Sequence, residues 1–590
     1  MHGKFLRTWM ALVVVVGLVV PAAAQSGTPQ GGQPARFAAS MSSANALLDD
    51  LRWVVVELAG ENQVYEEILV PSTEVFLYGV DLDRPAGMAW VFAKEGGARQ
   101  TFQIPLEGND PTVFRQENLE PIDILSRRRG RDLYELDSPS LDYQGWMRIA
   151  DGYGLISTVQ DDVPATAASA ETELLEILAK GNFDLAGRIV NTAEGIADRT
   201  AAFKELRENM LAGVTRRPTE TQQVFALRES SARHQADRME RMFVQTQELL
   251  VGGVTDSKKG EARGELLMSG LPGTELAKAL GRYGTIPSHF SAVPAAEGAI
   301  LSARVRLPID EIRRSGSREF NKLFEPVWME RIDKLEDLTA DQKSARKELA
   351  KQVLAILTES MELDQIDAFI DVAPLGTDKY AMLGGVRTAD GGKVAELLKG
   401  LPAGFKDIAV ELNVAQAGEA HIHRIKFTGT PPKALTKFYG EVPDLYVATQ
   451  KEAVWLAVGS GAIDRLTETI AVVAASEPKA DGIAITVDAH LSPIVLHLDE
   501  LAVETGFDLK EILARNQSNA TDEPRRQNPL AGIDLRSIAL PVLRTATLDR
   551  IEIRFIQADG AVKGTVRLER DLIKATGKII AKVAAEKLGG

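Results

Sequence analysis

The second half of this chain repeats features of its first half at one fixed spacing. Four pairs of positions are separated by 300 residues: Gly260 and Gly560, Gly264 and Gly564, Phe183 and Ile483, and Trp146 and Tyr446. The segments around each pair are alike, with alternating apolar residues after Phe183 and Ile483. Separated blocks with a common offset predict an internal duplication, which dictates architecture more strongly than any local motif. We expect Gly264 and Gly564 to occupy equivalent turns.

Each half shows the same order of expected elements. A strand runs into a helix, and a hairpin, a short helix and two more hairpins follow. A second strand-and-helix unit and a last hairpin then lead into a closing helix. In the second half the first strand alternates from Leu301 to Leu307, and Pro308 suits the first turn of a helix. The sequence predicts an α+β protein of two related lobes, 36–294 and 295–590, each an antiparallel sheet covered by helices on one face.

The two halves differ in their long helical stretches. Residues 313–362 add helix to the second half, where Thr339 and Gln342 have the spacing of a capping box. Residues 200–250 form a second, highly charged helical stretch, and residues 515–530 are a polar loop. We expect the strand from Ile483 and the closing helix to share the core of the second lobe. The residues assigned to that core are Ile483, Ile485, Val487, Leu572, Ile579, Ile580 and Val583.

The N-terminus has the pattern of a secretion signal. A basic head at Lys4 and Arg7 precedes an unbroken apolar run from 10 to 20, and Ala22 to Ala24 form a site for signal peptidase. The run is shorter than the roughly 20 apolar residues that span a bilayer. We expect a signal peptide over 1–24, cleavage before Gln25, a disordered polar leader over 25–35, and a periplasmic or extracellular protein; an uncleaved anchor is the alternative.

Composition excludes several classes of function. The chain contains no cysteine, which excludes disulfides, thiol catalysis and zinc–thiolate sites. Its net charge is −15, and the acidic residues are spread along the chain, so nucleic acid is not an expected partner. At 590 residues and 45% hydrophobic content, the chain can bury a large core without cross-links.

Several segments together resemble a known family. They are GAILSARVRLPIDEIRRSGSREFNKLF, ELDQIDAFIDVAP, YAMLGGVRTADGGKVAELL and DLYVATQKEAVWLAVGSGAIDRL, within residues 298–496. This region is similar to a family of secreted proteins of unknown function carried by planctomycetes and related bacteria, and the first half resembles it more faintly. The resemblance implies export and a repeated α+β module. It implies no activity and no functional residue.

Histidine pairs are the first candidates for a metal site. His421 and His423 alternate on an expected strand, so their rings point to one face, as a metal site requires. The same face continues with Ile425 and Phe427, and no third ligand is nearby, so a pair on the sheet surface is favoured. His490 and His497 flank an expected junction of strand and helix, where polar residues are common. We therefore assign no metal-binding residue and no cofactor.

Three other motifs have simpler structural interpretations. The basic cluster Arg127, Arg128, Arg129 and Arg131 suits an anion, but its place in the repeat is an exposed hairpin turn. Ser460 in Gly459-Ser460-Gly461 lacks the full pattern of a nucleophile elbow and is interpreted as a helix N-cap. Asp81 and Asp83 resemble part of a calcium loop but lack its third acid and its glycine, which favours a turn.

The sequence favours a binding or structural protein of the cell envelope over an enzyme, because no residues converge on a catalytic pattern. No catalytic residue is assigned, and the binding residues and partners stay unknown. Two alternatives remain. A periplasmic hydrolase would use scattered acids such as Asp364, Asp367 and Asp371, and clustered buried acids would favour it. A carrier of lipid or lipoprotein would hold an apolar ligand on a curved sheet, and large residues filling the concave face would exclude it.

Overall fold

A computed structural model describes residues 36–92, 98–140, 143–163, 168–376, 379–440, 444–505 and 534–588. The expected signal peptide (1–24), the leader (25–35) and the polar loop at 515–530 lie outside these residues. Within the described part of the chain no helix combines the length and the apolar character needed to cross a membrane.

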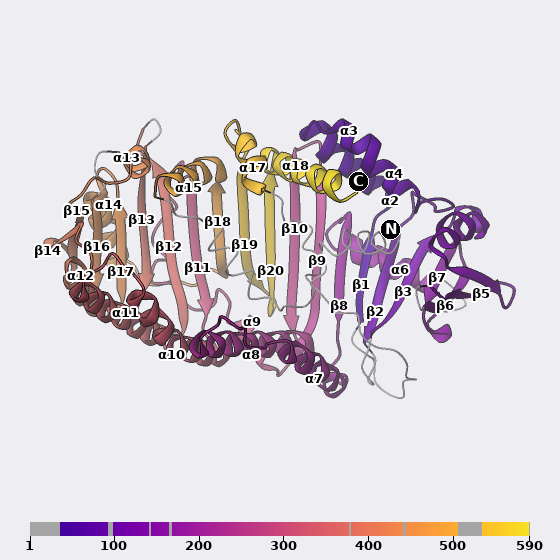
Figure 1. Cartoon of the computed structure of the whole chain (residues 1–590), viewed down its shortest axis with the longest axis horizontal. Coiled ribbons are helices and arrows are strands. Elements are labelled where there is room, and N and C mark those ends of the chain that lie inside the picture. The colour runs from indigo at the N-terminus through magenta and orange to yellow at the C-terminus, as the bar shows by residue number, and fades with distance from the viewer. Residues whose placement is uncertain are drawn as a thin grey trace.

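Twenty strands of the described residues form one antiparallel sheet that runs the length of the molecule (Figure 1). The strands of residues 36–270 are β1 (Arg36–Met41), β2 (Ala86–Phe92), β3 (Ala98–Pro105), β4 (Leu125–Arg128), β5 (Leu133–Ser138), β6 (Tyr143–Ala150), β7 (Tyr153–Ser157), β8 (Leu185–Val190), β9 (Thr246–Asp256) and β10 (Glu261–Gly270). The strands of residues 301–569 are β11 (Leu301–Pro308), β12 (Gln365–Pro374), β13 (Tyr380–Arg387), β14 (Ile408–Ala417), β15 (Ala420–Phe427), β16 (Leu445–Gln450), β17 (Ala453–Val458), β18 (Ile483–His490), β19 (Arg550–Ala558) and β20 (Ala561–Glu569).

The pairing of the strands follows the same path in both halves of the chain. From one edge of the sheet to its middle the order is β4-β5-β6-β7-β3-β2-β1-β8-β9-β10. From the other edge it is β14-β15-β16-β17-β13-β12-β11-β18-β19-β20. Strands β10 and β20 pair at the middle, so the halves share one continuous sheet instead of forming one sheet each.

The expectation for Gly264 and Gly564 was wrong in one respect. Both residues lie inside strands, in β10 and β20, and not in turns. The turns that precede these strands contain Gly260 and Gly560, with φ of 71° and 79°. A positive φ is easily adopted by glycine alone, which explains glycine at both turns.

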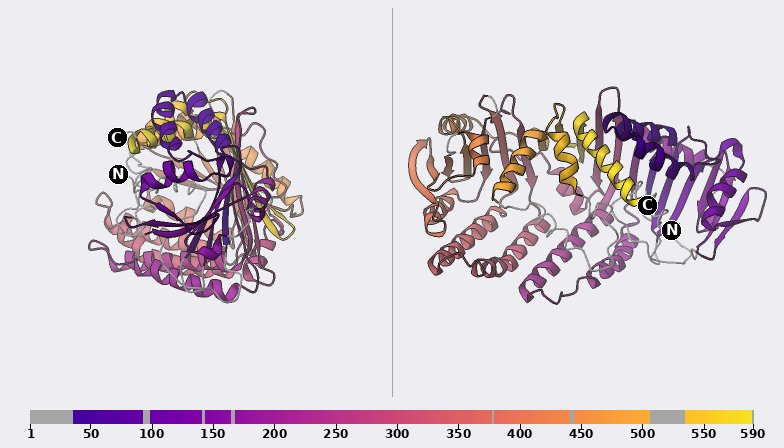
Figure 2. Two further views of the ribbon diagram at one scale, coloured as in Figure 1. Left: turned by 90° about the vertical axis from the view of Figure 1, so that its right-hand side faces the viewer. Right: turned by 45° about the horizontal axis from the view of Figure 1, so that its top comes forward.

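Helices line both ends of the strands, and the two rows project from the same face of the sheet (Figures 1 and 2). One row contains α2 (Ala44–Arg52), η1 (Trp53–Leu58), α3 (Asn62–Val64), η2 (Tyr65–Leu69), α4 (Val70–Glu74), α13 (Lys433–Tyr439), α15 (Leu491–Thr505), α17 (Leu535–Leu543) and α18 (Arg570–Lys587). The other contains α7 (Ile196–Ala212), α8 (Gln222–Gln245), α9 (Glu275–Gly281), α10 (Glu311–Asp333), α11 (Ala340–Ser360) and α12 (Gly391–Gly404). Sheet and helices together have the shape of a trough, and we call this face of the sheet the trough face.

The opposite, outer face is covered in two places, which corrects the expectation that helices lie on one face only. Helix α14 (Ala462–Ala474) packs its Leu466 and Ile470 into a cluster with Trp455 and Phe290. Helix α6 (Ala168–Ala179) packs against β1 and β8 through Ile177 and its neighbours. These two helices occupy corresponding places in the two halves, after β17 and β7.

The long helical stretches formed as expected. Residues 200–250 contain α7 and α8, and residues 313–362 contain α10 and α11. The Thr339 side chain accepts a hydrogen bond from the Gln342 backbone, and the Gln342 side chain accepts one from the Thr339 backbone. This confirms the capping box predicted at the start of α11.

The expected shared core of Ile483 and the closing helix did not form. A β-bulge at Ala484 shifts the register between Ile483 and Ile485, so Ile483 pairs with Ile556 and faces the other side from Ile485. Helix α18 packs instead on residues of the first half: its Ala581 and Ala584 lie in a cluster with Val55, Tyr65 and Leu69 of η1 and η2. The closing helix of one half thus covers the first helices of the other.

Candidate apolar binding trough

The trough face carries an unbroken band of apolar residues across the middle of the sheet. Directly opposed residues of antiparallel strands point to the same face, so the register identifies the members of this band. We call it the floor: Val251 and Gly253 of β9, Gly264 and Leu266 of β10, Val566 of β20, Ile553 of β19, Ile485 and Val487 of β18, Ala303 and Val305 of β11, and Ala368 and Ile370 of β12. All are partly exposed, and none belongs to a buried cluster. Seven adjacent strands at about 4.8 Å spacing make the floor about 29 Å long.

The rows of helices cover the ends of these strands and leave the floor between them. At one end Trp53, Leu58 and Ile573 pack on Ala262 and Leu568. At the other end Leu276 and Leu280 of α9 pack on Met268, Val562 and Phe555. The floor lies between these two lines of contact, so its side chains are flanked by helices but are not part of their packing.

The outer face of four of these strands, β10, β20, β19 and β18, is charged. Residues that alternate with the floor form ion pairs across neighbouring strands: Glu261 with Arg567, Arg567 with Glu552, Arg550 with Asp488, and Lys563 with Glu265. Within β19, Arg550 also pairs with Glu552. An antiparallel sheet with one polar and one apolar face has its polar face in water and its apolar face against other material. The floor is therefore the face of the sheet whose side chains are stabilised by contact with other apolar material.

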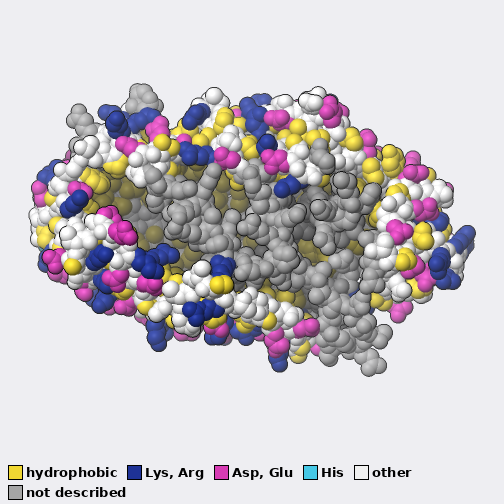
Figure 3. All heavy atoms as spheres, in the orientation of Figure 1, with side chains coloured by type: hydrophobic (Ala, Val, Ile, Leu, Met, Phe, Trp, Pro, Cys, Tyr) yellow, Lys and Arg dark blue, Asp and Glu magenta, His cyan; other side chains and the backbone are white. Residues whose placement is uncertain are grey.

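The space-filling view shows this side of the molecule directly (Figure 3). Where described residues are visible between the two rows of helices, the surface is hollowed and hydrophobic side chains line the hollow. Ile366 and Val386, on the trough face of β12 and β13, are 36% and 42% exposed. Charged side chains are gathered along the rims.

One wall of the trough carries an aromatic stripe on α10. Phe320, Phe324 and Trp328 follow each other at intervals of four residues, with ring centroids 5.3 Å and 5.6 Å apart. Arg313, on the same side of the helix, lies over the ring of Tyr283, which belongs to the cluster on the trough face. The stripe therefore faces the trough, and Phe320 is 42% exposed there.

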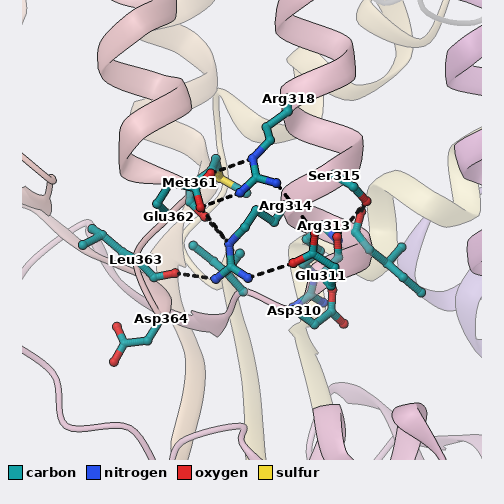
Figure 4. Close-up of polar contacts among 12 residues, drawn as sticks. Asp310, Glu311, Arg313, Arg314, Ser315, Arg318, Met361, Glu362, Leu363 and Asp364 are labelled. Atoms are coloured by element: carbon teal, nitrogen blue, oxygen red, sulfur yellow. Dashed lines mark hydrogen bonds and ion pairs between the residues drawn. The ribbon is translucent and has the colours of Figure 1, made fainter.

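Two arginines fix this wall to the sheet (Figure 4). Arg314 of α10 donates hydrogen bonds to the carbonyl oxygens of Met361 and Leu363, which lie between α11 and β12, at 3.3 Å each. Arg318 forms a two-pronged pair with Glu362, with N–O distances of 2.7 and 2.6 Å. The contacts hold the start of α10 against the end of α11, so the hairpin of helices has a defined position beside the floor.

The candidate acids of the hydrolase hypothesis are placed on the outer face or at its edge. Asp371 is buried and binds the Arg304 guanidinium through both oxygens at 2.8 Å. Asp367 is buried and accepts hydrogen bonds from the Ser288 hydroxyl at 2.8 Å and the His289 backbone N–H at 2.6 Å. Burial raises the pKa of Asp367, although these two hydrogen bonds oppose the shift. Asp364 is paired with Arg387 at the strand end.

These contacts give the two buried acids a structural role. Arg304 also donates to the Pro294 carbonyl, and Ser288 and His289 lie in the same connecting segment between the two halves. That segment buries Phe290 against Phe369 and Trp455. Asp367 and Asp371 therefore anchor the connection to the outer face, and the structure does not bring them together with Asp364 as a catalytic group.

Only one histidine of the pair His421 and His423 lies on the surface, where both were expected. His421 is exposed, whereas His423 is 2% exposed and both of its ring nitrogens are hydrogen-bonded. Nδ1 accepts from the Asn413 backbone N–H at 3.2 Å, and Nε2 lies 3.1 Å from the Thr449 hydroxyl. Burial, together with the neighbouring His421, lowers the pKa of His423. A neutral, fully bonded ring has no lone pair left for a metal, and no group of three or more His, Asp or Glu among the described residues is placed to hold one.

The remaining sequence candidates are also structural. Of the basic cluster, Arg129 and Arg131 lie in the exposed turn between β4 and β5, as expected, and Arg129 pairs with Glu135. Arg127 and Arg128 lie instead at the end of strand β4. Ser460 is not the N-cap of α14, which was wrong: that position is Gly461, in a left-handed conformation without a side-chain cap. Asp81 and Asp83 lie in a turn before β2, where Asp83 accepts a hydrogen bond from Asn45. His490 binds Asp549, and His497 stacks on Phe438.

No family model, no curated protein and no solved structure matches this chain. The sequence contains an indication of the trough that is spread over several strands and not contained in any one motif. Strands β11, β18, β19 and β20 alternate apolar and polar residues, but only the assembled sheet shows that the apolar members form one surface.

Proposed function

We propose that this protein binds elongated apolar molecules of lipid type in the trough. The observation that supports the proposal most directly is the floor, which extends over seven strands without a polar side chain and lies outside every buried cluster of the described residues. Soluble proteins rarely expose apolar patches of more than a few hundred Å² unless the patch binds something. Binding sites for small molecules are likewise concave and mostly apolar.

The chemistry of the floor favours a lipid over a protein partner. Protein interfaces contain about one hydrogen bond per 100–200 Å². The floor offers no side-chain donor or acceptor, and its backbone groups are used in the ladders between strands. A ligand that needs no hydrogen bonds fits this surface. A narrow molecule can reach the floor between the two rows of helices. About ten buried methylene groups would gain about 8 kcal/mol before the costs of binding.

We further propose that the chain is exported and arose by internal duplication. Export is supported by the basic head, the short apolar run and the peptidase site at the N-terminus. Duplication is supported by the identical strand order of the two halves and by the separation of 300 residues that recurs along the sequence. A lipid-binding protein outside the cytoplasm would carry its ligand through water between membranes or envelope layers.

The first experiment tests for bound lipid directly. The mature chain, from Gln25 onward, is purified without detergent, extracted with organic solvent and analysed by mass spectrometry, and its affinity for the fluorescent fatty acid cis-parinaric acid is measured. We expect lipid in the extract and saturable binding of the probe. The absence of both would overturn the proposal.

A matched pair of variants assigns the binding to the floor. Ile553→Glu places a charge in the floor, whereas Arg554→Glu changes the adjacent, exposed residue on the outer face. We expect Ile553→Glu to weaken binding of cis-parinaric acid at least tenfold and Arg554→Glu to leave it unchanged. Equal effects would contradict the assignment. A dimer in light scattering that Ile553→Glu dissociates would show instead that a second copy covers the floor.

A further inference from the structure

Most glycines inside the strands have a local packing reason. A Cβ built on Gly564 would lie 2.6 Å from the Phe555 ring, and one on Gly252 would lie 2.4 Å from the Phe183 ring. Similar contacts, at 3.4 Å or less, surround Gly87, Gly145, Gly154, Gly187, Gly270, Gly384 and Gly385. At these positions a neighbouring group occupies the space that a side chain would need.

Gly253 and Gly264 differ from all of these. In the described part of the chain, the nearest atom to a Cβ on Gly253 is the Arg263 carbonyl oxygen at 3.9 Å, and the nearest to one on Gly264 is the Gly252 carbonyl oxygen at 4.0 Å. Both have room for a side chain and lack one. They are also direct partners across β9 and β10, at one end of the floor. Glycine inside a strand marks a bulge, a tight bend, or a place where a ligand or another backbone approaches closely, and the register is regular at this pair.

The pair leaves a patch of bare backbone among larger residues. Leu185 on β8 and Val566 on β20 flank it across the sheet. Val251 and Leu266 bound it along the strands. The backbones of Leu185 and Val566 are three strand spacings apart, about 14 Å, so the patch between their side chains is about twice as wide as a single hydrocarbon chain.

We propose that this patch binds the rigid, flat part of the ligand, so that the ligand is a lipid with a fused-ring system. The inference rests on the proposed function and names the class of ligand. A flexible acyl chain can bend to fit between valine and isoleucine side chains. It would therefore gain no contact from the absence of side chains at Gly253 and Gly264. A rigid ring system cannot bend around side chains, and it packs with full contact only on a flat surface. The two glycines provide such a surface.

The test compares two probes on two variants of the mature protein. Dehydroergosterol, a fluorescent sterol, represents rigid rings, and cis-parinaric acid represents a chain. Gly264→Leu fills the bare patch, and Ala303→Leu adds a similar volume to the floor four strands away on the same row. We expect Gly264→Leu to weaken dehydroergosterol binding at least tenfold and cis-parinaric acid binding by less than twofold. Ala303→Leu should not show this selectivity.

Each outcome is decisive. If the wild-type protein binds cis-parinaric acid and not dehydroergosterol, or if Gly264→Leu affects both probes equally, the ring-binding patch is wrong and the lipid-binding function stands. If the protein binds neither probe and contains no extractable lipid, the function itself is wrong. Thermal melting of each variant confirms folding, and Gly264→Ala, with a smaller side chain, should show a weaker effect of the same kind.

Discussion

Glu265 on β10 lies directly opposite Thr565 on β20, the residue 300 positions further along the chain. Around this pair the register is symmetric: Gly264 opposes Val566, and Leu266 opposes Gly564. The separation of 300 residues in the sequence thus coincides with the point where the two halves of the sheet join.

Gly264 and Gly564, at symmetric positions, should respond oppositely to the same substitution. Gly564→Val forces a side chain against the Phe555 ring, and we expect a loss of about 1–3 kcal/mol of unfolding free energy. A Cβ on Gly264 meets no described atom closer than 4.0 Å, so for Gly264→Val we expect no loss, or a gain of up to about 1 kcal/mol from the lower flexibility of the unfolded chain. Urea unfolding measures both. Similar losses in both variants would contradict the packing described here.

Asp371 should matter for stability although it lies on the outer face of β12 and not in the floor. Asp371→Asn leaves the buried Arg304 guanidinium without its counter-charge, which costs about 3–5 kcal/mol in comparable buried pairs. Asp364→Asn, which breaks the more exposed pair with Arg387, should cost less than about 1 kcal/mol. Chemical denaturation tests the order, and a catalytic role would be indicated only if Asp371→Asn abolished an activity without affecting stability.

The two arginines at the start of α10 should differ in their effects. Arg318 and Glu362 are both nearly half exposed, and such a pair contributes at most about 1 kcal/mol. Arg314 is more buried and bonds two backbone carbonyls that would lose a charged donor, which corresponds to about 1.5–3 kcal/mol. We therefore expect Arg314→Ala to lower the melting temperature more than Arg318→Ala. The reverse order would show that the exposed pair, and not the carbonyl contacts, fixes the wall.

Stability should depend on pH through Asp50. Burial, and then the charges of Asp184 and Asp49, raise the pKa of Asp50 to about 7 from 3.8. The folded state therefore holds this proton more tightly than the unfolded state. Stability falls as the pH rises from about 4 to about 7, and above that it stays at the lower value. Asp50→Asn should melt at a higher temperature than the wild type at pH 8 and at a similar temperature near pH 4. Asp49→Asn, at an exposed site, should show a much smaller difference; equal differences would contradict the assigned burial.

Local patterns in the sequence predicted most of the elements and their order, but not α6 between β7 and β8. Alternation predicted the strands, helical spacing predicted α7, α8, α10 and α11, and the Thr339–Gln342 box predicted the start of α11. Details that depend on one residue's backbone were less predictable. The bulge at Ala484 turns Ile483 to the other face, and the start of α14 falls on Gly461 instead of Ser460, because both are fixed by neighbours in the sheet.

The sequence by itself determined which residues are apolar on alternate positions of each strand, and hence that every central strand has one face that avoids water. It did not determine what meets that face. An alternating strand has the same pattern whether a helix, a second sheet or a ligand covers it, because the pattern records only the removal of water and not the partner. Only the tertiary structure, by pairing β10 with β20 and directing the helices to the two ends of the strands, left the floor between Gly253 and Ile370 as a continuous surface.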